Sequence, residues 1–370
     1  MEERKPRVAI THGDTNGVGY ELIFKTFEDP AIMELCTPIV YGSPKVAAYH
    51  RKALDLQVQF NIINQAEEAK DNRLNLLTTF DEDIKVEIGQ PSEEATDAAK
   101  KALKRAIMDV QQGLVDVLVM GPDNLPDFLS KEPEVLKVRM ADELRVALIT
   151  NLLALKDVPE AITRQKIVEK GKLLHNCLRR DLRISTPRIA VLSLNPAAAG
   201  DEGSFGDEEK DVIIPAISEL EQAGVQAFGP YSSDAFFGNG YYTKFDAILA
   251  MYYNQGMSPL KALAQDAYVS LATGMPFVCT STESGACYDM AGKNCAELKP
   301  LLDAIFMGID VWRNRRNYDE PLANPLPKLY KEKRDDSEKV RFAVPKAKTE
   351  KTEKTERNSS DISADKDKKQ

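Results

Sequence analysis

The stretch FDAILAMYYNQG, residues 245–256, decides the fold. Residues 247–251 form a continuous apolar run that predicts a buried strand, and the turn 252–256 that follows is polar. In an α/β protein, side chains from several neighbouring strand ends converge at the carboxyl edge of the sheet, and ligands bind there. We therefore expect the functional site to lie near Tyr253.

Three other junctions have the same form, an apolar run that ends in a polar or glycine-rich loop. They are ITHGDTNGVG at 10–19, VALITN ending at Asn151, and VLSLNPAAAG at 191–200. The glycine spacing of the first, G-x-x-x-G-x-G, differs from the G-x-G-x-x-G fingerprint of dinucleotide-binding loops. We expect all four junctions to meet at one edge of a sheet.

Runs of strand length alternate with helix-length segments along residues 7–312. Strands are predicted at 7–11, 37–41, 57–63, 73–77, 115–120, 144–150, 188–194, 247–251 and 276–280. The longer helices are predicted at 93–112, 163–180, 207–223 and 298–312. This alternation predicts an α/β fold with mostly parallel sheets flanked by helices.

Length and charge exclude several classes of protein. A chain of 370 residues, 43% of them hydrophobic, is long enough for a large core and two lobes. Its net charge of −9 argues against a nucleic-acid partner. No run approaches the roughly 18 apolar residues that a membrane helix needs, and the first residues lack the apolar segment of a secretion signal. We expect a cytoplasmic protein with no membrane partner.

Cysteines and histidines are few and scattered. The five cysteines form no C-x-x-C pair, which suits a reducing compartment and favours buried structural thiols. Only three histidines are present, His12, His50 and His175, and this scarcity limits both metal binding and base catalysis near neutral pH. His50 is expected on the surface of its helix, and His175 in solvent.

Several of these motifs, in this order, identify a family. Residues 13–21, GDTNGVGYE, resemble the GDPAGIGPE of the 4-hydroxythreonine-4-phosphate dehydrogenase family of pyridoxal phosphate biosynthesis. ELRVALIT at 143–150, LNP at 194–196, AMYYNQG at 250–256 and TSTESG at 280–285 continue the resemblance. It covers nearly all of residues 7–312.

The resemblance implies a fold and a chemistry. The family is known as a homodimer of two-lobed α/β subunits, similar to isocitrate and isopropylmalate dehydrogenases, that use NAD and a divalent metal in the cleft. The metal polarises the substrate hydroxyl. By this resemblance, residues 1–122 plus 262–318 form the first lobe and 123–261 the second. Residues 319–370 have almost no apolar content beyond 345 and are expected to form a disordered charged tail.

The family's three metal-binding histidines have no counterpart in this chain. Their positions carry Asn151, Ala197 (or Ala198, because the loop is one residue longer) and Tyr253. An amide, a methyl group and a phenol do not replace three imidazoles as ligands of a divalent ion, so we expect no metal. The family's Asn and Arg at two later positions correspond to Ser270 and Cys279, and its GHTE substrate loop is absent.

Other family positions are retained, and each has a structural interpretation beside the functional one. They are Asp14, Gly17, Gly19, Asn195, Gln255 and Lys261. Asp14 could cap the following helix, Asn195 could satisfy a turn, and both glycines could serve the backbone alone. Lys261 is either a remnant anion-binding group or a surface residue.

Two main hypotheses for function follow. The first is a catalytically impaired homologue that acts as a binding or partner-regulating paralogue, either as a homodimer or as a heterodimer with an intact homologue, and that binds NAD or a small phosphorylated ligand. The alternative is an active NAD-dependent oxidoreductase with metal-independent chemistry. In it, Tyr253 is the acid–base group and Lys261 lowers the pKa of Tyr253. A third reading is a structural dimer without a ligand.

Overall fold

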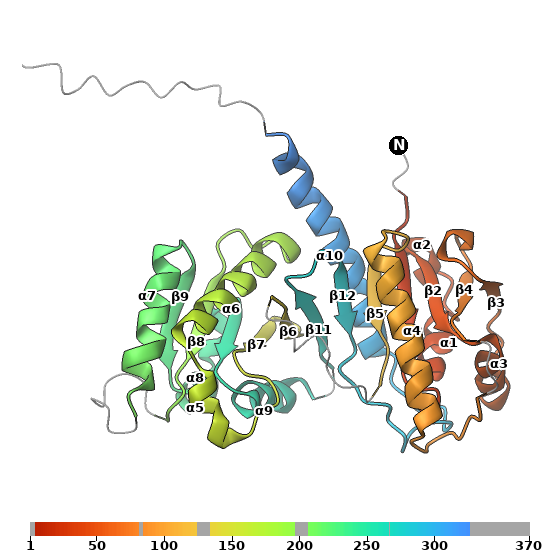
Figure 1. The fold of residues 1–370 in the computed structure, drawn as a ribbon, viewed down its shortest axis with the longest axis horizontal. Coiled ribbons are helices and arrows are strands. Elements are labelled where there is room, and N and C mark those ends of the chain that lie inside the picture. The colour runs from red at the N-terminus through yellow and green to blue at the C-terminus, as the bar shows by residue number, and fades with distance from the viewer. Residues whose placement is uncertain (1–3, 81–83, 124–133, 197–205, 266, 326–370) are drawn as a thin grey trace, which may run out of the picture. The chain divides into compact units, whose positions relative to one another are not determined.

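The computed structural model describes residues 4–80, 84–123, 134–196, 206–265 and 267–325 (Figure 1). One twelve-stranded sheet runs through them in the order β3-β4-β2-β1-β5-β12-β11-β6-β7-β10-β8-β9. The strands are β1 (Arg7–Thr11), β2 (Thr37–Gly42), β3 (Phe60–Ile63), β4 (Leu74–Thr78), β5 (Val117–Met120), β6 (Leu136–Ala141), β7 (Leu144–Leu148), β8 (Arg188–Leu192), β9 (Gln226–Tyr231), β10 (Ala247–Ala250), β11 (Val269–Thr273) and β12 (Val278–Ser281).

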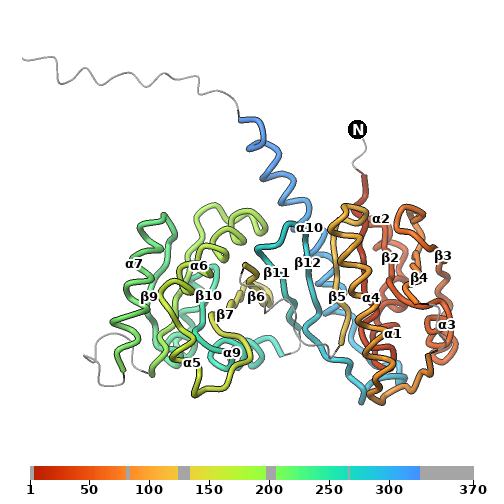
Figure 2. Tube along the Cα trace, viewed as in Figure 1, coloured from red at the N-terminus to blue at the C-terminus, as the bar shows by residue number. Residues whose placement is uncertain are grey.

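Helices cover both faces of this sheet. They are α1 (Gly19–Thr26), α2 (Ile32–Leu35), α3 (Pro44–Ala53), α4 (Glu93–Gln111), α5 (Val158–Ala161), α6 (Arg164–Asn176), α7 (Ile214–Gln222), α8 (Ser233–Gly238), α9 (Tyr253–Ala264) and α10 (Lys299–Ala323). In Figure 2 the blue tube of α10 lies beside the strands β11 and β12, which it contacts. No helix within the described residues is long and apolar enough to cross a membrane.

The predicted fold class is confirmed. Strands pair in parallel throughout the sheet except at its middle, where β12, β11, β6 and β7 pair antiparallel. Three strands were not predicted from the sequence: β6, β9 and β11. In β6, Lys137 and Arg139 interrupt the apolar pattern, so the segment does not have the continuous hydrophobic run of a buried strand.

The order of the strands separates two parts of the chain. β1 to β5 with β11 and β12 form one half of the strand order, and β6 to β10 form the other half. The predicted division at 122 and 262 falls between the same strands, although separate lobes stay a prediction. One boundary differs from the prediction: α10 continues to Ala323, past the expected start of the tail at residue 319. Asp319 is held there by an ion pair with Arg180.

Alternate residues of each strand enter different apolar clusters, as the two-residue period of a strand requires. On one face, Leu136, Val138 and Leu271 belong to the largest cluster, which α1, α6, α7 and α10 cover. On the other face there are two separate clusters. Ala272 and Cys279 join the one under α4, and residues of β7 and β10 join the one under α8 and α9.

A stacked aromatic group fills the core beneath the amino-terminal loop. The Tyr20 ring lies between His12 and His50, with ring centroids 5.0 and 5.2 Å away. The expectation that His50 lies on the helix surface is wrong: it is 2% exposed and its Nε2 donates to the Thr15 carbonyl at 2.7 Å. Val46, Ala47 and His50 share the inward face of α3.

Burial strongly affects the charge of His12. The side chain is fully buried, and this burial lowers the pKa of His12 to about 3. In the unfolded chain its pKa is about 6.5, so the unfolded state takes up the proton first as the pH falls. His12 therefore favours the folded state fully above pH 6.5, and this contribution declines as the pH falls towards 3.

We predict that His12→Phe makes the free energy of unfolding less dependent on pH between 6.5 and 4. The slope should fall by up to about 1.4 kcal/mol per pH unit, the value for one proton. Urea unfolding at a series of pH values measures this slope. His175→Phe is the matched control and should change it less, because His175 is only partly buried. Parallel curves for the wild type and His12→Phe would contradict the prediction.

Candidate functional site

The loop after β1 is held by the side chain of Asp14. Its Oδ1 accepts from the Asn16 backbone N–H at 2.8 Å, and its Oδ2 accepts from the Tyr288 hydroxyl at 2.9 Å. Asp14 is 3% exposed. It does not cap the following helix, because the N-cap of α1 is Val18, which has no side-chain capping bond. The carboxylate instead closes the turn and attaches the segment after β12 to it.

Gly17 and Gly19 are required by close backbone contacts. A Cβ at Gly17 would clash with the Ala286 carbonyl oxygen, and one at Gly19 would clash with the carbonyl oxygen of His12. Both contacts are with backbone atoms of the protein. The structural interpretation of both glycines is therefore sufficient: the loop folds back on its own strand and on the segment 284–288, which leaves no room for a side chain.

Asn195 and Gln255 join the ends of β8 and β10. Gln255 Nε2 donates to the Ser193 carbonyl at 2.5 Å, and its Oε1 accepts from the Met251 backbone N–H at 2.7 Å. Asn195 Nδ2 donates to Glu208 and Glu209 at 2.9 and 2.8 Å. Both Gln255 groups and the Asn195 N–H groups are therefore used within the protein, and the Asn195 side chain donates to two carboxylates of the segment before α7.

The positions corresponding to the family's metal ligands are only partly described. Ala197 and Ala198 lie outside the described residues. Asn151 follows β7 and is half-buried, and Tyr253 begins α9 with its side chain against the apolar cluster under α8 and α9. Within the ranges that the structure describes, no group of three or more His, Cys, Asp or Glu side chains could hold a metal ion. These residues do not fit the metal that the family resemblance implies.

Lys261 lies against a residue that the sequence analysis did not identify. Its Nζ is 5.9 Å from the centroid of the Tyr268 ring. Burial raises the pKa of Tyr268, and the Lys261 cation opposes this. Tyr253 and Lys261 are eight residues apart on α9, roughly 12 Å along a helix axis. The ring that Lys261 contacts is therefore that of Tyr268, and the action of Lys261 on Tyr253 stays a prediction.

A polar group at the middle of the sheet was also missed. Lys137 Nζ lies 3.0 Å from Glu283 Oε1, and Arg139 Nε lies 3.4 Å from Glu283 Oε2. Their side chains are 11% and 4% exposed. Burial alone would raise the pKa of Glu283, but Arg139 and Lys137 outweigh it and lower this pKa to about 2. Glu283 is thus ionised at neutral pH. Its own motif, TSTESG, was the only signal of this site in the sequence.

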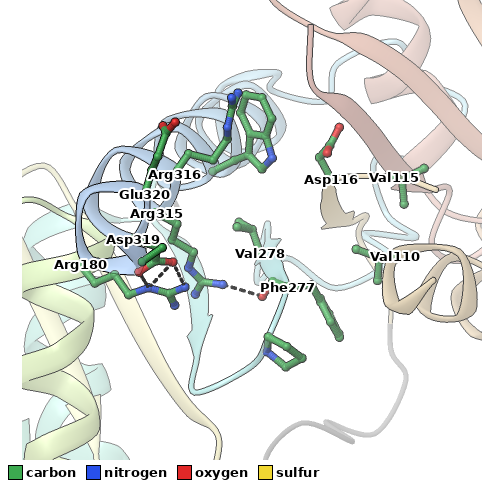
Figure 3. A pocket seen from close by; sticks show the side chains of 13 residues that line it. Val110, Val115, Asp116, Arg180, Phe277, Val278, Arg315, Arg316, Asp319 and Glu320 are labelled. Atoms are coloured by element: carbon green, nitrogen blue, oxygen red, sulfur yellow. Dashed lines mark hydrogen bonds and ion pairs between the residues drawn. The ribbon is translucent and has the colours of Figure 1, made fainter. Parts of the chain in front are cut away.

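A separate cavity of about 520 Å³ lies beside α10, and residues of α10 and of other elements line it (Figure 3). Trp312, Arg315 and Arg316 line it together with Arg180 and Asp319. Arg315 donates to the Phe277 carbonyl at 2.9 Å, and Arg180 donates to Asp319 (Figure 3). Arg315 also donates to Asp181. The guanidinium groups of Arg180 and Arg315 therefore have partners within the protein, and we assign them a structural role.

The sheet and its polar strand ends define an α/β protein with its candidate site at the carboxyl edge of a mostly parallel sheet. The model of the pyridoxal phosphate biosynthetic protein PdxA family matches residues 34–308. The chain belongs to this family. The resemblance stated from the sequence is confirmed.

Individual proteins that are similar to this chain support the same family. The chain is 48% identical to a 4-hydroxythreonine-4-phosphate dehydrogenase of Bacteroides thetaiotaomicron over 359 residues, which is 92% of this chain and 98% of that protein. It is 30% identical to a D-threonate 4-phosphate dehydrogenase of Cupriavidus necator, over 85% of this chain and 100% of that protein. The crystal structure of the 4-hydroxythreonine-4-phosphate dehydrogenase of Klebsiella pneumoniae superposes with a TM-score of 0.69 at 26% identity, over 84% of this chain and 99% of that one.

We predict that Gln255→Glu lowers the free energy of unfolding by about 1–3 kcal/mol, the cost of a buried polar group without its partner. The substitution removes the N–H that donates to the Ser193 carbonyl and places a carboxylate against that oxygen. Urea unfolding of both proteins gives the difference. Gln222→Glu makes the same change at an exposed position on α7 and should have little effect. Equal stabilities for Gln255→Glu and Gln222→Glu would argue against the role assigned to Gln255.

Proposed function

We propose that the protein is a catalytically impaired homologue of 4-hydroxythreonine-4-phosphate dehydrogenase that acts by binding a ligand or a partner. The observation that carries this proposal is the nature of Asn151 and Tyr253. At these family metal positions stand an amide and a phenol, neither of which is a usual ligand of a zinc-like ion. The reaction of the family depends on the Lewis acid that such a ion provides.

The retained residues support this proposal because they can be explained without a reaction. Asp14, Asn195 and Gln255 each form hydrogen bonds within the protein that fix the ends of β1, β8 and β10. Such residues are needed to keep the fold even when the chemistry is lost. Selection on the scaffold alone accounts for them.

The proposal extends to the ligand and the partner. The names of two relatives both contain a 4-phosphate, and the family resemblance implies NAD, so these are the first ligands to examine. The family's dimer surface would allow a homodimer, or a heterodimer with an intact homologue whose activity this chain regulates. A cytoplasmic location belongs to the same proposal.

We predict that the purified protein forms no NADH from 4-phosphohydroxy-L-threonine and NAD above a control without protein, with zinc or magnesium supplied. We expect no turnover because the chain lacks the family's metal-binding histidines. The metal content measured on the same sample should therefore be below one ion per chain. The Bacteroides thetaiotaomicron relative, assayed in parallel, is the positive control. Turnover similar to that of the relative would overturn the proposal of impaired catalysis.

The partner role has its own experiment. This protein and an intact homologue are co-expressed with different tags, and the complexes are separated by size and analysed by native mass spectrometry. A mixed dimer with altered turnover per intact subunit supports regulation. Only separate homodimers, together with no binding of NAD or substrate by this chain, would leave a structural dimer as the better description.

The alternative, an active oxidoreductase without a metal, is favoured by the surroundings of Tyr253. This residue begins α9 at the end of β10, and its charge would affect Tyr268, which Lys261 contacts. A phenol at a strand end, within electrostatic reach of a second phenol, could transfer a proton. The residues for acid–base catalysis would then be Tyr253 and Tyr268 rather than histidines.

Under this alternative, we predict that Tyr253→Phe lowers kcat at least about 100-fold, the lower range for loss of an acid–base group. Steady-state kinetics of any NADH formation measures this. Tyr252→Phe is the matched control, because Tyr252 packs against the main apolar cluster and should leave kcat unchanged. Turnover that survives Tyr253→Phe would exclude Tyr253 as the acid–base group.

A further inference from the structure

β6 lies in the middle of the sheet (Figure 1). Lys137 and Arg139 are two residues apart on this strand and therefore share one of its faces. Arg139 is directly opposite Ser270 of β11, and Lys137 is opposite Ala272. On this face, the apolar cluster under α4 ends at Ala272, and the cluster under α8 and α9 begins at Ala141. The two cations therefore lie in a polar strip between two apolar clusters.

The guanidinium group of Arg139 is buried, and two of its nitrogen atoms lack a hydrogen-bond acceptor among the described residues. Its side chain is 4% exposed, and its only ion-pair partner among the described residues is Glu283, at 3.4 Å. Within the same described ranges, its Nε and Nη1 have no hydrogen-bond acceptor. A buried guanidinium is stable only when its N–H groups are hydrogen-bonded to acceptors, because its water has been removed. These donors thus indicate an acceptor that a ligand would supply.

Glu283 does not fully provide this acceptor. Its Oε1 accepts from Lys137 at 3.0 Å and from the Ser281 hydroxyl at 3.3 Å. Its backbone has a φ of +52°, in the left-handed region that a residue with a Cβ adopts at a cost, so its position is fixed by its surroundings. The carboxylate is therefore held mainly towards Lys137.

We propose that Arg139 and Lys137 form a binding site for the carboxylate or phosphate group of a small anionic molecule. Arginine is suited to planar or tetrahedral oxyanions because its N–H groups form charge-assisted hydrogen bonds to them. Glu283, at 16% exposure, and Lys137, at 11%, provide the side of the site that solvent can reach. The apolar clusters on either side strengthen the attraction by excluding water.

This inference rests on the proposed function, since it gives the retained scaffold a ligand, and it adds the residues that would hold the ligand. Tyr268 lies nearby: the charges of both Glu283 and Lys261 act on its hydroxyl. The retained Lys261 is therefore close enough to contribute to the same electrostatic environment. The site does not require any of the family's metal positions.

The experiment is isothermal titration calorimetry of the full chain with inorganic phosphate and, separately, with malonate, at low salt. We expect binding of at least one of them at one site per chain. Arg139→Met, which keeps the length of the side chain and removes the charge, should weaken binding roughly tenfold or more, and Arg139→Lys should weaken it less. Arg180→Met removes a similar charge beside α10 and should leave binding unchanged.

Lys137→Met provides a second variant in case Arg139→Met does not fold, which circular dichroism and thermal unfolding will show. It should also weaken binding, and the anion should raise the melting temperature of the wild type more than that of either variant. No binding of either anion by the wild type, or equal binding by the wild type and a folded Arg139→Met or Lys137→Met, would overturn the proposal.

The outcome is independent of the assay for NADH formation. If the wild type shows turnover and Arg139→Met loses anion binding, impaired catalysis is refuted and this site is kept. No anion binding together with no turnover would refute this site and keep impaired catalysis. Phosphate binding without malonate binding would identify a phosphorylated ligand, and the reverse result a carboxylate.

Discussion

The pairing of β11 with β6 joins the two sides of the sheet. Five consecutive residue pairs, from Val269↔Met140 to Thr273↔Leu136, form the only ladder between β1–β5, β11 and β12 on one side and β6–β10 on the other, within the described residues. A one-residue shift in this register would move every side chain of β6 to the other face. Val138 and Met140 would leave the main apolar cluster, and Arg139 would enter it. The hydrophobic pattern of β6 therefore fixes the register and, with it, the position of Arg139.

Hydrogen bonds at the strand ends fix the loops of the scaffold without using the side chains at positions 151 and 253. In this chain, the amides of Gln255 and Asn195 and the carboxylate of Asp14 connect loops to neighbouring strands. Each connection lies inside the protein and uses no group at position 151 or 253. The hydrogen bonds of the buried Gln255 and Asp14 make the arrangement of these loops specific. The geometry of these strand ends therefore depends on contacts within the protein.

The sequence predicted what depends on periodicity, and it missed what depends on contacts between distant segments. The apolar runs of β1, β5 and β10 indicated the parallel strands, and the capping residue Thr163 indicated the start of α6, because these signals are local. β6 was missed because Lys137 and Arg139 resemble solvent-facing residues until Glu283, more than 140 residues away, is placed beside them. Tyr268 was missed for the same reason. His50 could have been predicted, since its spacing from Val46 and Ala47 already places it on the inward face of α3.

The electrostatics of the second half of the chain agree with a requirement for negative charge near Arg139. Lys170 of α6 is 8% exposed, and its Nζ donates to the Leu148 carbonyl at 3.5 Å. Burial, and then the positive charges of Lys166 and Arg139, lower the pKa of Lys170 to about 8. A buried lysine beside other cations is destabilised in its charged form, and a nearby anion reverses that effect. Glu283 forms ion pairs with both Lys137 and Arg139, and the proposed oxyanion would add negative charge beside Arg139. A buried cation costs stability unless an anion or an acceptor compensates for it, and the anion proposed at Arg139 would do this for the donors of that side chain.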